Sequence, residues 1–281
     1  MNMPRQADLA PVAITVAPNG GRRTKADHPA LPLTPDELAA TAAACLETGA
    51  CMIHVHVRDT DGRHLLDAEA CRAVIAAIRA AVGGRLVIQI TSETLGVYRP
   101  AEQMEVVRKV RPEAVSLALR ELLPDESHEA GFAQFLAWLR RENIVPQIIL
   151  YTPEEEASLA ALKARGLIPY DNMPVLYVLG RYTAGQISSP TDLLPFLAPG
   201  MPRFAHWTVC AFGSRETACV TAGALLGGHV RVGFENNFRL PDGSLAPDNA
   251  ALVSASQVAL RASGLVIADA ERLRREWSAS W

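Results

Sequence analysis

The chain has 281 residues, of which 49% are hydrophobic and 20% are charged, which is enough apolar material for one large core. Its formal net charge of -3 argues against nucleic acid or an anionic membrane surface as the main partner. We find neither an apolar run of the roughly 20 residues that cross a bilayer nor an apolar leader behind a basic N-terminus, and therefore expect a cytoplasmic protein. The five cysteines are odd in number and lack CxxC spacing, so we expect buried free thiols.

Short runs rich in Val and Ile alternate with segments of helical periodicity, a pattern typical of a parallel α/β fold. Strands are predicted at residues 12–17, 51–57, 85–91, 113–119, 144–151, 175–179, 204–211 and 229–235. Helices are predicted at residues 35–48, 67–82, 100–110, 128–142, 153–165, 189–197, 214–227 and 247–263. Because eight parallel strands close a barrel, we predict one (β/α)8 TIM-barrel domain over residues 1–281.

Two chain segments carry more specific signals. Thr34 is placed to cap the first helix, with Pro35 at its first position and Glu37 completing a capping box. Residues 268–277 read as a C-terminal helical tail with a solvated charged face, and Trp277 and Trp281 are candidates for packing on a neighbouring subunit.

A pair of histidines ends the second predicted strand. His54 and His56 are one residue apart, so a strand turns both imidazoles to the same face. Glu235 ends the eighth strand, and strand ends meet at one mouth of a barrel. Two His and one Glu are a catalytic zinc set with an open fourth position, although cobalt, manganese or iron accept the same ligand types. The alternative is that the histidines are ordinary residues of a strand.

Other polar residues are predicted at the same mouth. Arg231 shares the face of Glu235 but lies deeper, where it needs an anionic substrate or a salt bridge with Glu121 or Glu93. The Arg58-Asp59 pair either orients the ligands or, for Asp59, belongs to a solvated turn. The basic, glycine-bearing loop at residues 17–25 is a weak signal for phosphate or carboxylate binding.

Four stretches together resemble the beta-keto acid cleavage enzyme family, whose founding activity is 3-keto-5-aminohexanoate cleavage. They are Ile-Thr-Val-Ala-Pro-Asn-Gly at 14–20, Leu-Pro-Leu-Thr-Pro-Asp-Glu at 31–37, Ile-His-Val-His-Val-Arg-Asp at 53–59, and Gly-Gly-His-Val-Arg-Val-Gly-Phe-Glu-Asn-Asn at 227–237. The resemblance implies a zinc-dependent TIM barrel, usually tetrameric. It would transfer the acyl part of a beta-keto acid onto the CoA of acetyl-CoA and release acetoacetate.

The resemblance also assigns roles to individual residues. It implies that His54, His56 and Glu235 hold one zinc ion per chain, which would polarise the keto group. Arg231 matches the family arginine that organises the reacting groups, and Thr91 stands where the family has a substrate-contacting serine. We place Ser92 and Asn19 in the same substrate-binding set.

The departures from the family pattern concern acid–base chemistry. Asn236 replaces an aspartate implicated as the general base, and an amide cannot take a proton. Carboxylates are also replaced by Gln147 and Ile149, whereas Glu121 and Glu93 are new. We therefore expect either a relocated base, with Glu121 as first choice before Glu93, or loss of the cleavage activity.

The expected substrate follows from one further departure. Arg22 stands where the founding enzyme has a glutamate that pairs with the substrate amine, so we expect a keto acid with a neutral or negative tail. The alternative is that Arg22 points to solvent or to the CoA phosphates. Two other functions stay open: a different metal-dependent barrel lyase, aldolase or hydrolase, and a zinc-binding barrel that is catalytically idle.

Overall fold

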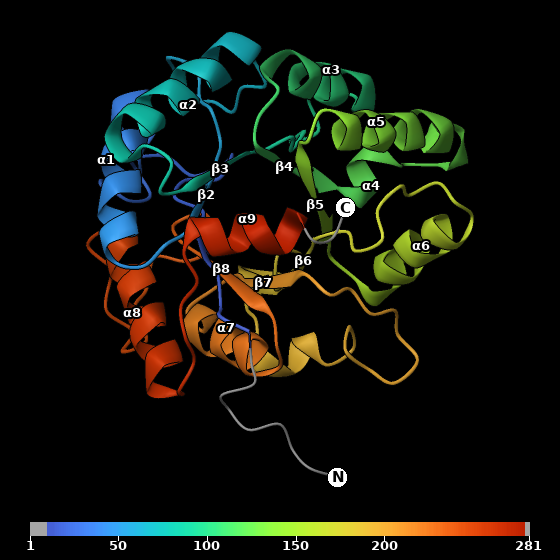
Figure 1. The fold of residues 1–281 in the computed structure, drawn as a ribbon. Coiled ribbons are helices and arrows are strands. Elements are labelled where there is room, and N and C mark those ends of the chain that lie inside the picture. The colour runs from blue at the N-terminus through green and yellow to red at the C-terminus, as the bar shows by residue number, and fades with distance from the viewer. Residues whose placement is uncertain (1–9, 279–281) are drawn as a thin grey trace.

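Eight parallel strands close into a barrel that is surrounded by helices, which confirms the predicted fold (Figure 1). The computed structural model describes residues 10–278. Each strand pairs with its neighbours in chain order, and β1 pairs with β8 to complete the barrel. The strands are β1 (Ile14–Val16), β2 (Met52–Val55), β3 (Val87–Ile90), β4 (Ala114–Ala118), β5 (Val145–Leu150), β6 (Val175–Leu179), β7 (Trp207–Ala211) and β8 (His229–Val232).

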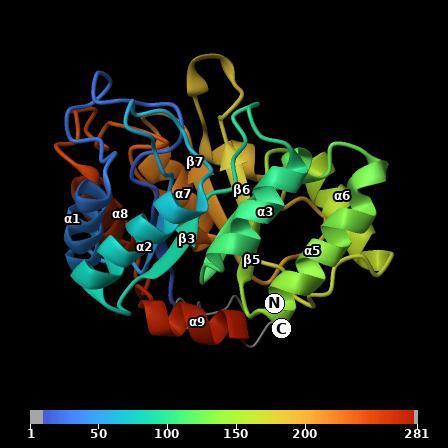
Figure 2. The same ribbon diagram turned by 90° about the horizontal axis from the view of Figure 1, so that it is seen from above.

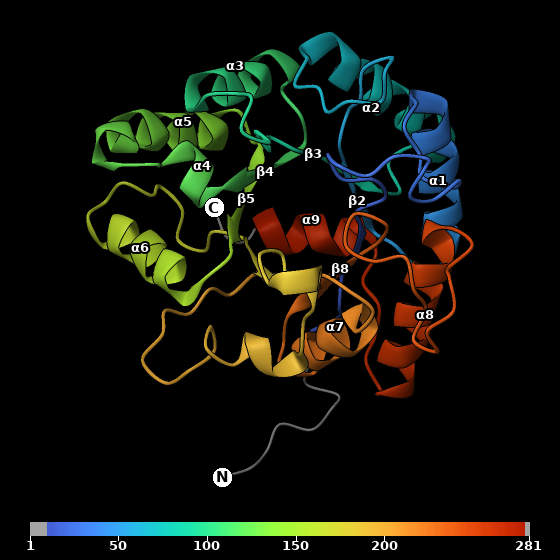
Figure 3. The same ribbon diagram turned by 180° about the vertical axis from the view of Figure 1, so that it is seen from behind.

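The helices form the outer ring, seen from the opposite side in Figure 3. They are α1 (Pro35–Glu47), α2 (Ala68–Val82), α3 (Pro100–Val110), α4 (Leu119–Leu122), α5 (Glu129–Arg141), α6 (Pro153–Ala164), α7 (Glu216–Leu225), α8 (Asn249–Ala262) and α9 (Ala270–Ser278). Short 3₁₀ turns lie at Glu126–His128, Ala184–Gln186 and Pro190–Leu193. No helix within residues 10–278 is long and apolar enough to span a bilayer.

Two local predictions about helices were incomplete. The helix predicted at residues 189–197 is only the 3₁₀ turn Pro190–Leu193, because Pro195 and Pro199 remove backbone donors that a continuing helix needs. The single turn α4 was missed, since four residues are too few to show helical periodicity.

The start of α1 has the predicted cap. The Thr34 hydroxyl accepts from the backbone N–H of Glu37, and the Glu37 carboxylate accepts from the backbone N–H of Thr34 at 3.1 Å. This reciprocal pair satisfies two of the backbone donors that a helix start leaves free.

All five cysteines are buried and free, as predicted.

Helix α9 closes the end of the barrel opposite the loops that follow the strands (Figure 2). Its Leu273 and Trp277 pack with residues at the N-terminal ends of strands, among them Met52 and Val87. Trp277 is 4% exposed, so its predicted place on a neighbouring subunit was wrong. Trp281 lies outside the described residues. The site must therefore be approached from the other end, where the C-terminal ends of the strands meet.

Candidate metal centre and active-site pocket

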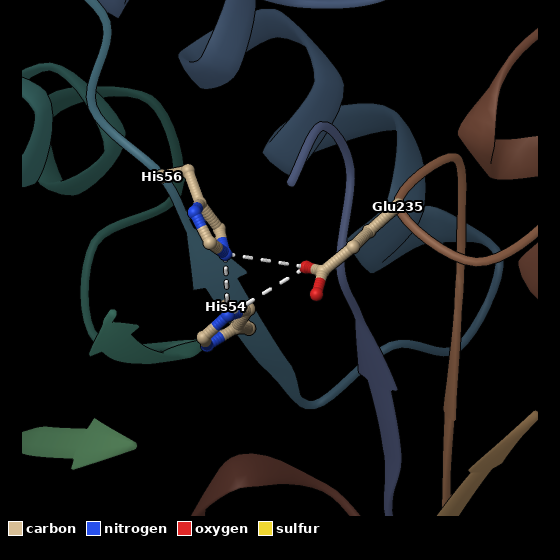
Figure 4. A group of neighbouring side chains, drawn as sticks. All are labelled: His54, His56 and Glu235. Atoms are coloured by element: carbon tan, nitrogen blue, oxygen red, sulfur yellow. Dashed lines mark hydrogen bonds and ion pairs between the residues drawn. The ribbon is translucent and has the colours of Figure 1, made fainter. Parts of the chain in front are cut away.

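The three predicted ligands meet at the C-terminal mouth of the barrel (Figure 4). His54 is in β2, whereas His56 and Glu235 lie just beyond the ends of β2 and β8. The two Nε2 atoms are 3.1 Å apart, and Glu235 Oε2 lies 3.6 Å from that of His54 and 3.5 Å from that of His56. One nitrogen or oxygen atom of each side chain therefore faces a common point.

The chemistry of these atoms fits a divalent cation. Nδ1 of His54 lies 2.8 Å from Oε1 of Gln89; an amide oxygen can only accept, so Nδ1 carries the proton and Nε2 is left as a ligand. Burial lowers the pKa of His54 to about 3, which keeps the ring neutral. The Oε2 atom of Glu235 is buried and has no hydrogen-bond partner within residues 10–278, which suits an atom that binds a metal ion. A mixed His/carboxylate set suits zinc well.

A chain of amide hydrogen bonds crosses the barrel beneath the ligands. Gln89 Nε2 donates to Oε1 of Gln147 at 3.1 Å, and Gln147 Nε2 donates to the Thr208 hydroxyl at 3.2 Å. Each amide is oriented by its neighbour, so the chain fixes the oxygen of Gln89 towards His54. This role was missed for Gln89 and Thr208, although polar residues in otherwise apolar strands were a signal for it. Gln147 had been noted only as a lost carboxylate.

Asn19 holds the backbone of His56. Its Nδ2 donates to the carbonyls of His56 at 2.9 Å and Pro32 at 3.1 Å, while its Oδ1 accepts from the His56 N–H at 3.2 Å. Asn19 is fully buried, and these bonds use both amide hydrogens and the oxygen. The amide therefore fixes the chain where β2 ends, and a role of Asn19 in substrate binding stays a prediction.

Arg231 pairs with the glutamate ligand. Its Nη2 donates to Glu235 Oε1 at 2.9 Å and to Asn236 Oδ1 at 3.3 Å. Burial raises the pKa of Glu235, but the Arg231 charge and the contacts with His56 and His54 together outweigh burial and hold that pKa well below its usual range. The salt bridge with Glu121 or Glu93, considered as an alternative to an anionic substrate, is not formed, because Arg231 pairs with Glu235. The Nε and Nη1 atoms of Arg231 have no hydrogen-bond partner in the described chain, and Arg231 lines the pocket above the ligands.

Behind Asn236 lies a buried acid that sequence reasoning missed. Glu216, the first residue of α7, accepts from the backbone N–H of Gly233 and from the Asn236 amide, both at 3.1 Å, and from the Asn237 amide at 3.4 Å. Burial raises the pKa of Glu216 to about 8. Asn236 thus links Glu216 to Arg231, donating to one and accepting from the other. An aspartate at this position could not donate to Glu216 unless it were protonated.

Glu93 and Thr91 line the pocket that contains the ligands. Glu93 Oε2 lies 3.7 Å from Nδ1 of His56, and its Oε1 lies 3.5 Å from Nη2 of Arg181, a cation that sequence reasoning missed. The Thr91 hydroxyl accepts from the backbone N–H of Glu93 at 3.0 Å. Glu93 is therefore a carboxylate with access both to the ligands and to any molecule bound in the pocket.

Ser92 and Glu121, which were predicted at the mouth, do not line this pocket. Ser92 donates to the carbonyl of Ser116 at 2.8 Å. Glu121 Oε2 accepts from the backbone N–H of Thr94 at 3.0 Å and from Gln103 Nε2 at 3.1 Å. Although burial raises the pKa of Glu121, its carboxylate stabilises the loop after β3. Of the two new acids, Glu93 lines the pocket that contains the candidate metal ligands, and Glu121 does not.

The basic loop after β1 lies at the edge of the site. Arg22 is exposed and lines an outer pocket with Arg23 and Arg181, next to Glu235. Gly20 has a φ of +60°, and a Cβ there would lie 2.7 Å from Cγ of Glu235, so glycine lets this loop pass close to the ligand.

Arg58 and Asp59 are not a ligand-orienting pair. Arg58 Nε donates to the carbonyl of Gly20 at 3.0 Å, which fixes the loop after β1. Asp59 accepts from the backbone N–H groups of Asp61 and Arg63, at 2.9 and 2.8 Å, as expected of the solvated turn.

The model of one protein family, the beta-keto acid cleavage enzymes, matches residues 11–277. The chain belongs to this family. The 3-keto-5-aminohexanoate cleavage enzyme of Fusobacterium nucleatum is 30% identical over 245 residues, which cover 85% of this chain and 88% of that enzyme. The 3-oxoadipate:acetyl-CoA acetyltransferase of Cupriavidus necator is 29% identical over 252 residues, which cover 87% of this chain and 86% of the relative.

The apo structure of ObcA shares the fold, with a TM-score of 0.69 at 15% sequence identity over 89% of this chain and 66% of ObcA. Membership makes this chain an enzyme of the beta-keto acid cleavage class, so the pocket at the mouth of the barrel is its candidate active site.

Proposed function

We propose that this protein exchanges acyl groups between a beta-keto acid and acetyl-CoA. The C–C bond between the keto carbon and the α-carbon of the substrate breaks, and the α-carbon forms a new bond to the acetyl carbonyl carbon. The CoA sulfur leaves the acetyl group and bonds to the acyl group that is released. The products are acetoacetate and a new acyl-CoA, so every atom of the two substrates is accounted for.

One observation supports this proposal above the others. His54, His56 and Glu235 converge beside Arg231 in one pocket at the mouth of a barrel that belongs to this family. A zinc ion held by the three ligands would act as a Lewis acid on the keto oxygen. Arg231 lines this pocket, and its buried Nε and Nη1 donors have no hydrogen-bond partner in the described chain, so we assign Arg231 to the substrate carboxylate.

We assign the base to Glu93. A general base must reach its proton within hydrogen-bond distance, and Glu93 lines the pocket whereas Glu121 is engaged by Thr94 and Gln103. Asn236 cannot accept the proton as a base, and its amide is held between Arg231 and Glu216. We assign Asn236 the role of positioning Arg231 beside Glu235.

The substrate proposed is not an amino-bearing keto acid. Arg22, Arg23 and Arg181 line the outer pocket together with Glu93 and Glu235, so the lining has an excess of positive charge that disfavours a cation. This outer pocket suits the phosphates of CoA.

We further propose that the protein is a cytoplasmic homotetramer. Size-exclusion chromatography with light scattering would test the tetramer, and a monomer in solution would contradict it.

The decisive experiment combines zinc analysis with turnover. Purified protein is incubated with acetyl-CoA and a panel of beta-keto acids, and acetoacetate and acyl-CoA are quantified together. His54→Ala, His56→Ala and Glu235→Ala should each lose most of the roughly one zinc per chain that we expect of the parent, together with activity. Wild-type zinc content in these three variants would refute the assignment of the ligands.

The base is tested with a matched pair of variants. Glu93→Gln keeps an oxygen that can accept from His56, so zinc content should be unchanged while turnover falls about 100-fold or more. Glu121→Gln should keep turnover within a few-fold. If Glu93→Gln is fully active, the general base is another residue. If the wild type binds zinc but yields acetoacetate from no keto acid of the panel, the catalytically idle alternative is correct.

A further inference from the structure

The walls of the active-site pocket are divided into two chemically different halves. The polar half, which carries the candidate ligands, consists of His54, His56, Thr91, Glu93, Arg231 and Glu235. Two further polar residues of the lining, Ser116 and Arg181, come from the other part of the chain. The apolar half consists of Ala118, Ile149, Tyr151, Val178 and Phe212. Residues of the apolar half also pack against one another as a separate hydrophobic cluster inside the barrel.

The topology explains this division. The apolar half comes from four consecutive strands: Ala118 ends β4, Ile149 and Tyr151 are at the end of β5, Val178 is in β6 and Phe212 follows β7. The polar half comes from β8, β2 and β3 and the loops that follow them. Because parallel strands present alternate residues to the barrel interior, neighbouring strands bring these side chains to one wall.

The side chains of Ala118, Ile149, Val178 and Phe212 contain no hydrogen-bonding group that could compensate a charge. Arg181 and Glu93, which also line the pocket, lie 3.5 Å apart as an ion pair. The Arg181 guanidinium stacks over the Phe212 ring at 5.0 Å from its centre, and the Arg120 guanidinium stacks over the Tyr151 ring at 4.4 Å. Tyr151 stays neutral because burial raises its pKa well above the usual range. An ammonium or carboxylate pressed against Ile149 and Val178 would lose its hydration without compensation, which is costly.

We infer that the acyl tail of the substrate is an uncharged hydrocarbon, and that it lies against Ala118, Ile149, Val178 and Phe212 while the keto acid end faces the metal ligands. This inference rests on the proposed function and narrows its substrate to beta-keto acids with apolar tails. Each methylene that enters such a wall is worth about fourfold in affinity. The tail therefore selects among keto acids that share the same reacting end.

Matched keto acids test the inference. With wild-type protein, kcat/KM should rise about fourfold for each methylene from 3-oxopentanoate through 3-oxohexanoate to 3-oxoheptanoate, until the wall is covered. 5-Methyl-3-oxohexanoate should exceed 3-keto-5-aminohexanoate, which has an ammonium in place of one methyl group, by at least about 100-fold. It should exceed 3-oxoadipate similarly. Preference for either charged tail would overturn the inference.

Two variants test whether the apolar half causes the preference for uncharged tails. Ala118→Val narrows the wall without changing its polarity and should move the optimum to a shorter tail. Ile149→Glu adds a carboxylate and should shift the ratio of kcat/KM values at least about tenfold towards the amino-bearing tail. Val258→Ala, at a position on α8 that is 62% exposed, is the control and should leave the profile unchanged. A profile that neither Ala118→Val nor Ile149→Glu alters would show that the tail lies elsewhere.

A binding measurement separates this inference from the proposed function. If no keto acid is turned over, the proposed function fails, but titration calorimetry with hexanoate, 6-aminohexanoate and adipate still reports on the pocket. Hexanoate should then bind at least about tenfold more tightly than either of the other two, and Ala118→Val should weaken it. Equal binding of the three carboxylates would overturn the inference on its own.

Discussion

Replacing Glu216 with glutamine should change how the stability of this protein depends on pH. Glu216 is fully buried, and its pKa is raised from 4.5 to about 8 by burial. Between these two values the unfolded chain has released the proton while the folded chain retains it. Raising the pH therefore favours the unfolded state, and the wild type should lose stability through this window.

The magnitude follows from the size of the shift. One pKa unit corresponds to about 1.4 kcal/mol, so the full shift is worth about 5 kcal/mol, of which about 3 kcal/mol falls between pH 5 and 7.5. Glutamine has the shape and donor pattern of the protonated acid and does not titrate. It should keep the contacts to Gly233 and Asn236, so the stability of Glu216→Gln relative to wild type should grow by about this amount.

Urea unfolding at several pH values, with equal metal content in the two proteins, measures this difference. Comparing variant with wild type cancels the pH dependence of metal binding, which both share. Glu105→Gln, at an exposed position on α3, is the control and should parallel the wild type. A wild type that gains stability relative to Glu216→Gln as the pH rises would refute the reasoning, because Glu216 would then be ionised in the folded protein.

Three further outcomes are expected. Gln89→Leu should weaken zinc binding about 10- to 100-fold in a chelator competition, because His54 loses the acceptor for its Nδ1 proton; unchanged affinity would contradict this role. Thr34→Ala should lower the free energy of unfolding by about 1 kcal/mol through loss of the α1 cap, and no change would mean that water replaces it. Trp277→Ala should cost about 3 to 5 kcal/mol in the same assay, whereas a solvated α9 would lose little.

The barrel and the meeting of the three candidate metal ligands could be predicted because they follow from periodic patterns. The spacing of His54 and His56 puts both on one face of a strand, and barrel topology brings Glu235 to them although it is far away in sequence. No comparable rule connects Glu216 to Asn236, since their contact depends on how α7 begins beside the end of β8. A buried acid at a helix start has no distinguishing spacing.

The position of a single helical turn decided which new acid reaches the pocket. Glu121 was expected to project from the end of β4, but β4 ends at Ala118 and α4 begins at once, so the chain turns away and Glu121 bonds to Thr94. Glu93 follows β3 without an intervening helix and stays at the mouth. Sequence placed both acids near strand ends, whereas the local turn determined where each carboxylate lies.

The two halves of the pocket are also separated along the chain, which affects how the protein can evolve. All five residues of the apolar half fall within 118–212, while the polar half is encoded before and after that interval, with Ser116 and Arg181 as pocket residues outside this simple division. Recombination that exchanges the central third of the gene between relatives would thus transfer tail preference in one step and leave the metal ligands in place. Substrate range in this barrel can therefore diverge by inheritance of a single segment.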